Sequence, residues 1–197
     1  MLQRSAEWFA ERATRLTGSD WAAALGLNPY RSRQKLWRIK TGLEQVLSNY
    51  HMERGVEHEH DLVFAYEVET GNVVDEVGLA VHPAHEWLAA SPDGLVGDRG
   101  VLEGKCPATI RAELSAAHFV QCQAQMECAQ RDWCDYVQWA DGEITIMRVA
   151  RSTAFFDMAL PLLRAFWGHV TGLEQPPRAK ANSALVALVD ELRQRVG

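Results

Sequence analysis

Three side chains that suit a hydrolytic metal site lie close together in the sequence: Asp93, Glu103 and Lys105. Glu103 and Lys105 end a run that is expected to form a strand, residues 101–105. Side chains alternate between the two faces of a strand, so Glu103 and Lys105 point the same way and Gly104 points the other way. A carboxylate and an ammonium on one face of a core strand are unfavourable to bury without a function.

A short turn at Asp93-Gly94 is expected to bring Asp93 beside this pair. Two carboxylates that converge form an oxygen-ligand site for Mg²⁺, and Gly104 could add its backbone carbonyl. A lysine beside such a metal suits phosphodiester hydrolysis, because it can orient or deprotonate the attacking water or offset charge in the transition state. The spacing alone fits a surface ion pair on an edge strand equally well.

Further polar side chains on two expected helices are candidates for the same site. Glu57 and Glu59 lie on the helix before the sheet, and one of them could approach the metal, although a solvated helix face is the simpler interpretation for Glu57. Gln121, Gln123 and Gln125 lie on a later helix. Gln121 and Gln125 are four residues apart and therefore share a face. Exposed glutamines are the alternative.

The elements that must position these residues follow from hydrophobic period and stop signals. The pattern predicts an α/β domain with a mixed central sheet flanked by helices. Helices are expected at 5–15, from Thr17 or Ser19 to Gly26, and at 32–41, 52–70, 115–130 and 153–171; strands are expected at 73–81, 87–91, 101–105, 135–139 and 144–149. Residues 1–197 are interpreted as one domain whose segment 173–197 forms a C-terminal loop and helix.

Composition limits the class of protein. The chain has 197 residues, 47% of them hydrophobic, which fits one domain with a sizeable core. Its four cysteines form no CxxC pair, so reduced thiols are expected rather than a zinc site. No apolar stretch approaches the roughly 20 residues that span a bilayer, so we expect a soluble, cytoplasmic protein without a membrane partner. The net charge of −6 does not by itself indicate nucleic-acid binding, but basic residues cluster locally.

From about Trp8 to Trp167 the chain resembles the lambda-exonuclease family of phage recombination nucleases, the YqaJ-type viral recombinases of the PD-(D/E)XK superfamily. Several ordered motifs carry the resemblance: Gly18-Ser19-Asp20, Leu36-Trp37 with Lys40-Thr41-Gly42, Met52-Glu53-Arg54-Gly55 with Glu59, Leu88 to Gly94, Leu102 to Pro107 and Gln121 to Met126. It implies a PD-(D/E)XK, restriction-endonuclease-like core.

The resemblance also implies roles for matching residues. Asp93, Glu103 and the Gly104 carbonyl would bind two Mg²⁺ ions, with Mn²⁺ as the alternative metal, and Lys105 would be the catalytic lysine. Glu59 matches a helix glutamate that supports the metal site. The glutamine that helps to set the site matches Gln123, or Gln121.

A terminal 5′ phosphate is bound, in the family, where Ser19 lies at a helix start, a position with free backbone N–H groups. Arg12 matches an arginine that joins it. The chain departs from the family pattern at two positions. Thr14 replaces a frequent glycine, which leaves the contact of Arg12 open, and Gly104 replaces a larger apolar residue.

The implied activity is metal-dependent 5′-to-3′ degradation of one strand of linear double-stranded DNA. It would leave a 3′ overhang for single-strand-annealing recombination. The implied assembly is a homotrimeric ring around DNA with a single-strand annealing protein as partner. Two alternatives remain: a catalytically silent DNA-binding module on the same fold, and an endonuclease or repair nuclease of the same superfamily.

Overall fold

A computed structural model describes residues 3–45, 50–178 and 180–196. The predicted α/β class is confirmed. The helices are α1 (Ala6–Ala13), α2 (Gly18–Ala24), α3 (Arg33–Lys40), α4 (Tyr50–Glu57), α5 (Glu59–Thr70), α6 (Ala116–Ala129), α7 (Thr153–Thr171) and α8 (Ser183–Arg193). The strands are β1 (Leu16–Thr17), β2 (Val74–Asp75), β3 (Ala80–Val81), β4 (Leu88–Ala90), β5 (Gly94–Val96), β6 (Gly100–Lys105), β7 (Trp133–Ala140) and β8 (Glu143–Ala150).

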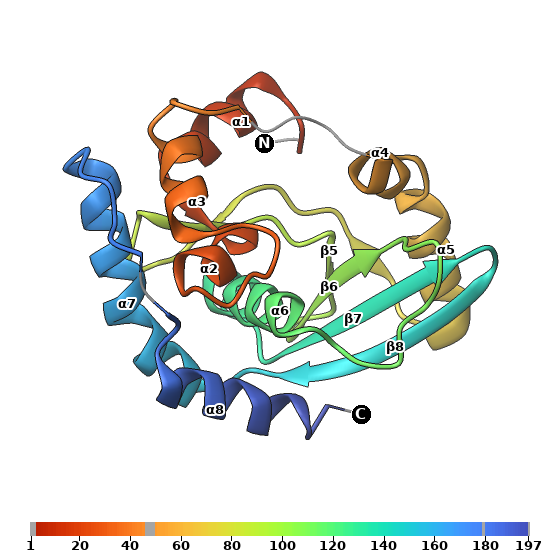
Figure 1. Cartoon of the computed structure of the whole chain (residues 1–197). Helices are drawn as coiled ribbons and strands as arrows, with labels where there is room; N and C mark the ends of the chain where they lie inside the picture. The colour runs from red at the N-terminus through yellow and green to blue at the C-terminus, as the bar shows by residue number, and fades with distance from the viewer. Residues whose placement is uncertain (1–2, 46–49, 179, 197) are drawn as a thin grey trace.

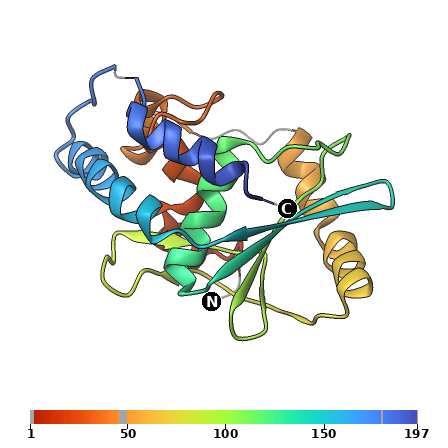
Figure 2. The ribbon, with the colours of Figure 1, turned by 90° about the horizontal axis from the view of Figure 1, so that it is seen from below.

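The predicted mixed sheet is present as five strands in the order β2-β5-β6-β7-β8. β6 pairs parallel with β7, and the other neighbours pair antiparallel. Helix α5 packs on the sheet at one side and α6 crosses its other side, as the two views show (Figure 1 and Figure 2). A second, three-stranded sheet has the order β1-β4-β3.

The hydrophobic core forms two layers, one on each face of the five-stranded sheet. Val101 of β6 belongs to the larger layer, with α2, α6, α7 and α8, whereas Leu102 belongs to the smaller layer beneath α5. This alternation continues along β6, so Glu103 and Lys105 lie on the α6 side and Gly104 lies against α5. The same-face prediction for Glu103 and Lys105 is therefore confirmed.

Most local signals specify the element bounds. Helix α7 spans residues 153–171 as predicted, and Ser32 and Asn182 cap the starts of α3 and α8. The antiparallel strands β7 and β8 form a hairpin that turns at Asp141 and Gly142, which have φ angles of 51° and 93°. Two successive residues with positive φ match the twist of an antiparallel pair.

The single helix predicted for 52–70 is wrong, because the structure has two helices, α4 and α5. His58 separates them with φ −107° and ψ 10°, outside the α-helical range. The backbone N–H of His58 still donates to Arg54, and the carbonyl of His58 accepts from Leu62. The chain therefore changes direction at His58, although neither glycine nor proline stands there as a sequence signal for a helix end.

The single strand predicted for 73–81 is also wrong. Its first part pairs as β2 with β5 in the larger sheet, and its last part pairs as β3 with β4 in the smaller sheet. The segment thus passes from one sheet to the other, and residues 76–79 between the two short strands form no ladder.

The four cysteines are free and buried, as expected for reduced thiols. Across the described ranges, no helix combines the length and the apolar character needed to cross a membrane.

Candidate active site

Antiparallel pairing of β5 with β6 brings Asp93 to the carboxylate and lysine of β6. The backbone N–H of Asp93 donates to the Leu102 carbonyl at 3.0 Å, and Oδ2 of Asp93 accepts from the Gly104 N–H at 2.7 Å. The expected turn at Asp93-Gly94 is therefore wrong, since Gly94 is the first residue of β5. A Cβ on Gly94 would lie 2.1 Å from Cγ1 of Val74, so close packing against β2, not a turn, requires glycine there.

Glu103 is buried between β6 and α6, and both of its carboxylate oxygens are hydrogen-bonded. Oε1 accepts from Nζ of Lys105 and from Nε2 of Gln121, the latter at 2.7 Å. Oε2 accepts from Nε2 of Gln125. A buried carboxylate needs such donors. The network therefore fixes the orientation of Glu103 and holds the Lys105 ammonium beside it.

Gln123 does not lie at this site, although it was the first match for the site glutamine. Its Nε2 donates to the Ala150 carbonyl at 2.8 Å, and its Oε1 accepts from the Ser152 N–H at 2.9 Å. Two residues along a helix turn a side chain to nearly the opposite face, whereas four residues return it. Gln123 therefore fastens α6 to the junction of β8 and α7, and Gln121 and Gln125 face the carboxylate.

Gln125 is the residue that the family match missed. The four-residue spacing from Gln121, which places both amides on one helix face, does indicate Gln125 from the sequence. Oε1 of Gln125 is buried and has no hydrogen-bond partner among the described atoms. It is an acceptor available to a bound group.

Glu59 begins α5 and is ion-paired with Arg4. Its charge is close enough to Asp93 to raise the pKa of that carboxyl. Glu59 therefore approaches the site from the α5 side, as expected, whereas the Glu57 side chain is 74% exposed, as a solvated helix face requires. No sequence pattern indicates Arg4 as a site residue, because its partner Glu59 is far away in the sequence.

The electrostatics of the site favours the ionisation of one of the two carboxyl groups over the ionisation of both. Burial and the nearby charge of Glu103 raise the pKa of Asp93 to about 7, although Lys105 and the Gly104 N–H act in the opposite direction. Burial disfavours the ammonium of Lys105, but Glu103 and Asp93 outweigh it and raise the pKa of Lys105 above its ordinary value. Lys105 is thus held as a cation, and the two carboxylates carry an unfavourable concentration of negative charge.

The structure brings Arg12 and Ser19 together. The Arg12 guanidinium donates to Oγ of Ser91 at 3.2 Å and lies 3.5 Å from Oγ of Ser19. It also stacks on the Trp8 ring at 4.2 Å from the ring centroid. The N-cap of α2 is Thr17, which forms a capping box with Asp20. Ser19 is therefore not the capping residue, and it is exposed.

Arg12 and Ser19 line a pocket of about 170 Å³ that also includes Asp93, Gln121 and Gln125. The pocket is therefore continuous with the carboxylate site. An anion held at the start of α2 would lie in the same cavity as the groups that contact Glu103.

A divalent cation such as Mg²⁺ requires oxygen ligands around it. Within residues 3–45, 50–178 and 180–196, no three His, Cys, Asp or Glu side chains are already gathered as a metal cluster. The repelling pair Asp93 and Glu103 and the unpartnered oxygen of Gln125 nevertheless suit Mg²⁺, which binds one or two carboxylates and keeps several waters. The residues present fit the metal.

A mixed sheet whose central strand carries Glu-x-Lys, and whose antiparallel neighbour delivers an aspartate, defines a nuclease fold of the PD-(D/E)XK type. Within that class, residues 7–132 match the YqaJ-like viral recombinase domain. The chain belongs to this family.

Solved structures agree with this assignment. The alkaline exonuclease LHK-Exo from Laribacter hongkongensis has a TM-score of 0.69 at 29% identity, and its complex with dAMP has a TM-score of 0.70 at 30% identity. In both comparisons 97% of each chain is covered. A phage related exonuclease from Haemophilus somnus 129PT, at 14% identity and a TM-score of 0.65, shares the fold over 81% of this chain and 94% of its own.

A curated relative is longer. The uncharacterized protein R354 of Acanthamoeba polyphaga mimivirus is 26% identical over 157 residues. The matched part is 69% of this chain, but only 29% of the mimivirus protein.

Proposed function

We propose that the chain is a metal-dependent exonuclease that degrades one strand of linear duplex DNA from its 5′ end and leaves a 3′ overhang for single-strand-annealing recombination. Family membership and likeness to alkaline exonuclease support a nuclease role in recombination. The observation that carries the proposal is the shared cavity: the anion-binding pair Arg12 and Ser19 opens onto the wall that holds Asp93.

Asp93, Glu103 and the Gly104 carbonyl, with Glu59 beside them, would hold two Mg²⁺ ions, which Mn²⁺ could replace. When bound, the metal would lower the pKa of an attacking water and neutralise phosphate charge. Lys105 is held as an ammonium, so it would donate to the scissile phosphate or orient the attacking water. A protonated amine cannot accept a proton, which argues against Lys105 as the general base. Gln121 and Gln125 would keep Glu103 in place by donating to its two oxygens.

Arg12 is suited to the terminal phosphate. Trp8 stacks on its guanidinium and Ser91 accepts from it, so its planar fork is held in position before substrate arrives. Arginine binds phosphate with two parallel N–H donors in this geometry. Ser19 would add a hydroxyl donor at the start of α2.

The decisive assay compares digestion of linear duplex that carries a 5′ phosphate with digestion of the same duplex with a 5′ hydroxyl, in Mg²⁺. We expect faster digestion of the phosphorylated end, and Arg12→Ala should reduce that preference by about tenfold or more, the value of a charge-assisted contact. Arg38→Ala, an exposed arginine of α3, is the matched control. Equal rates on the two ends in the wild-type protein would contradict the proposal.

Closed circular duplex separates the alternatives. An exonuclease leaves it intact, an endonuclease of the same superfamily cuts it, and a silent DNA-binding module acts on neither substrate.

We further propose that the whole chain acts as one nuclease domain, in the cytoplasm, as a homotrimeric ring around DNA with an annealing protein as partner. Light scattering with and without duplex DNA tests the trimer, and a monomeric mass in both conditions would reject it.

A further inference from the structure

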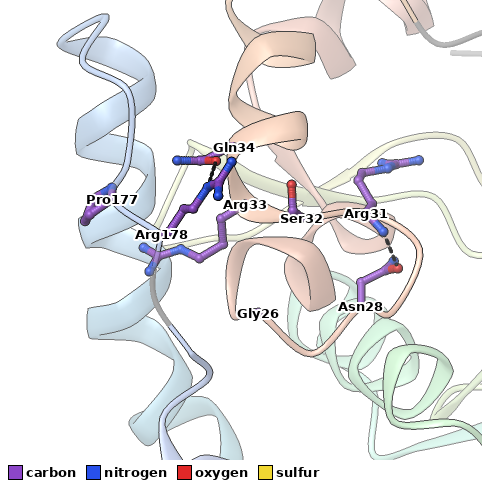
Figure 3. Close-up of a pocket in the computed structure, with 8 residues that line it drawn as sticks. All are labelled: Gly26, Asn28, Arg31, Ser32, Arg33, Gln34, Pro177 and Arg178. Atoms are coloured by element: carbon purple, nitrogen blue, oxygen red, sulfur yellow. Dashed lines mark hydrogen bonds between the residues drawn. The ribbon is translucent and has the colours of Figure 1, made fainter.

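A second pocket, of about 400 Å³, lies at the other end of α2. Figure 3 shows it between the loop that leaves α2, the start of α3 and the segment that follows α7. Its polar side chains are those of Asn28, Arg31, Ser32, Arg33, Gln34 and Arg178. The pocket is thus built from two parts of the chain that are far apart in sequence.

Three arginines and no carboxylate line this pocket. Arg31 forms an ion pair at 3.1 Å with Asp20, a carboxylate that also pairs with Lys40. In the part of the chain that the structure describes, Arg33 and Arg178 form no ion pair, and the buried Nε of Arg33 has no hydrogen-bond partner. Burial also lowers the pKa of Arg33. Two cations that line one pocket without a nearby carboxylate repel each other, and a bound anion would offset this repulsion.

Hydrogen bonds hold the wall in place without any ligand. Gln34 accepts from Nε of Arg178 at 3.3 Å and donates to the Pro176 carbonyl at 3.3 Å. Figure 3 shows Arg178 reaching towards Gln34 from the C-terminal segment. The Arg33 guanidinium lies 5.9 Å from the centroid of the Phe166 ring on α7. The pocket therefore presents cationic and amide donors from a prearranged wall.

We propose that this pocket binds a backbone phosphate of the DNA substrate, a few nucleotides away from the terminal phosphate. The inference rests on the proposed function. Ser19 lies near the start of α2 and Gly26 just beyond its end, and at a rise of about 1.5 Å per residue they are about 10 Å apart along the helix. Successive phosphates of one strand advance by about 3.4 Å along the axis of duplex DNA and lie farther apart than that in space, because the strand winds around the axis. A separation of about 10 Å is therefore on the scale of one to a few nucleotides.

Arg31 links the two pockets. It pairs with Oδ1 of Asp20, while Oδ2 of Asp20 accepts from Oγ1 of Thr17, next to Ser19. The two anion-binding positions therefore belong to one rigid unit around α2. Their separation is fixed by the fold, which suits a polymer with regularly spaced phosphates better than independent small anions.

The test is binding of 5′-phosphorylated duplex DNA in Ca²⁺, measured by fluorescence anisotropy over a range of salt concentrations. The variants are Arg33→Gln/Arg178→Gln and the single charge reversal Arg178→Glu on the exposed C-terminal segment. Arg195→Gln, at an exposed arginine of the chain's last part, is the control. Loss of the one phosphate contact should lower the salt slope by about one, so between about 50 and 200 mM salt the double variant should lose about fourfold less affinity than wild type.

Arg178→Glu should weaken DNA binding at low salt, and this variant keeps the test valid if Arg33→Gln impairs packing against α7. An unchanged slope in both variants, with wild-type protein that binds and cleaves DNA, would overturn this inference alone. No DNA binding or cleavage by the wild-type protein would overturn the proposed function and this inference with it. If inorganic phosphate raises the Tm of the wild type but not of the double variant, while DNA binding is unchanged, the pocket takes a free anion and the DNA assignment is wrong.

Discussion

Replacement of Asp93 by asparagine should stabilise the metal-free protein while it abolishes cleavage. Asparagine has nearly the same shape, and its Oδ1 can still accept from the Gly104 N–H. It removes the negative charge that burial and Glu103 make unfavourable. The residue that the proposed reaction requires is therefore one that the fold tolerates poorly in the absence of metal.

The magnitude follows from the pKa of Asp93, which rises from 3.8 to about 7. Each pKa unit is equivalent to about 1.4 kcal/mol, so the full effect above pH 7 is about 4 kcal/mol. Asp93 is partly exposed to the pocket, and solvent screening should reduce this to about 2 kcal/mol. The pKa of Asp93 is higher in the folded protein than in the unfolded chain. The contribution of this carboxyl to the free energy of unfolding of the metal-free protein is therefore highest at about pH 4 and below, and it falls as the pH rises through about 7.

Urea unfolding in EDTA at about pH 4 and about pH 8.5 measures the effect. Asp93→Asn and wild type should be equally stable at the lower pH, and the variant should be more stable by about 2 kcal/mol at the higher pH. Asp157→Asn, on an exposed position of α7, should show no such difference. Added Mg²⁺ should stabilise the wild type and leave the variant unchanged. A variant less stable than wild type at the higher pH would refute the electrostatic reasoning.

Three further predictions concern neighbouring groups. Lys105→Met should lower the single-turnover cleavage rate by at least about a hundredfold, as loss of a charge-stabilising donor does, and leave DNA affinity in Ca²⁺ unchanged; a loss of affinity with an intact rate would reverse the assignment. Gln125→Leu should impair cleavage, because Glu103 loses a donor, whereas Gln123→Leu should lower the free energy of unfolding by about 1–3 kcal/mol and preserve the rate per folded molecule. Asp20→Asn should lower that free energy by about 3 kcal/mol at neutral pH. Burial opposes the charge of Asp20, but Lys40 and other donors keep its pKa low, so urea unfolding should show the difference shrinking as the pH falls below about 4.

The sequence predicts best what repeats with a fixed period. Alternation along β6 places Glu103 and Lys105 on one face, and the four-residue helical spacing places Gln121 with Gln125. The match by family motif selected Gln123, because a motif records order and not direction. Helix geometry decides between the three glutamines, and it excludes Gln123.

Elements without a period of their own could not be predicted. β1 and β5 have two or three residues, and they are strands only because a partner strand lies beside them. The placement of Asp93 depends on one of these, β5. The basic pocket joins Arg33 to Arg178 across the chain, and no local pattern connects the two.

The side chain of Leu62 on α5 fills the space in which a side chain at position 104 would lie. A Cβ at position 104 would lie 2.8 and 2.9 Å from the two methyl carbons of Leu62, and 3.5 Å from Oδ2 of Asp93. A larger apolar residue at position 104 would therefore collide with the Leu62 side chain of α5 unless that side chain shifted. The two positions should covary among homologues, large with small, and a graft of valine at 104 should succeed only together with a smaller residue at 62.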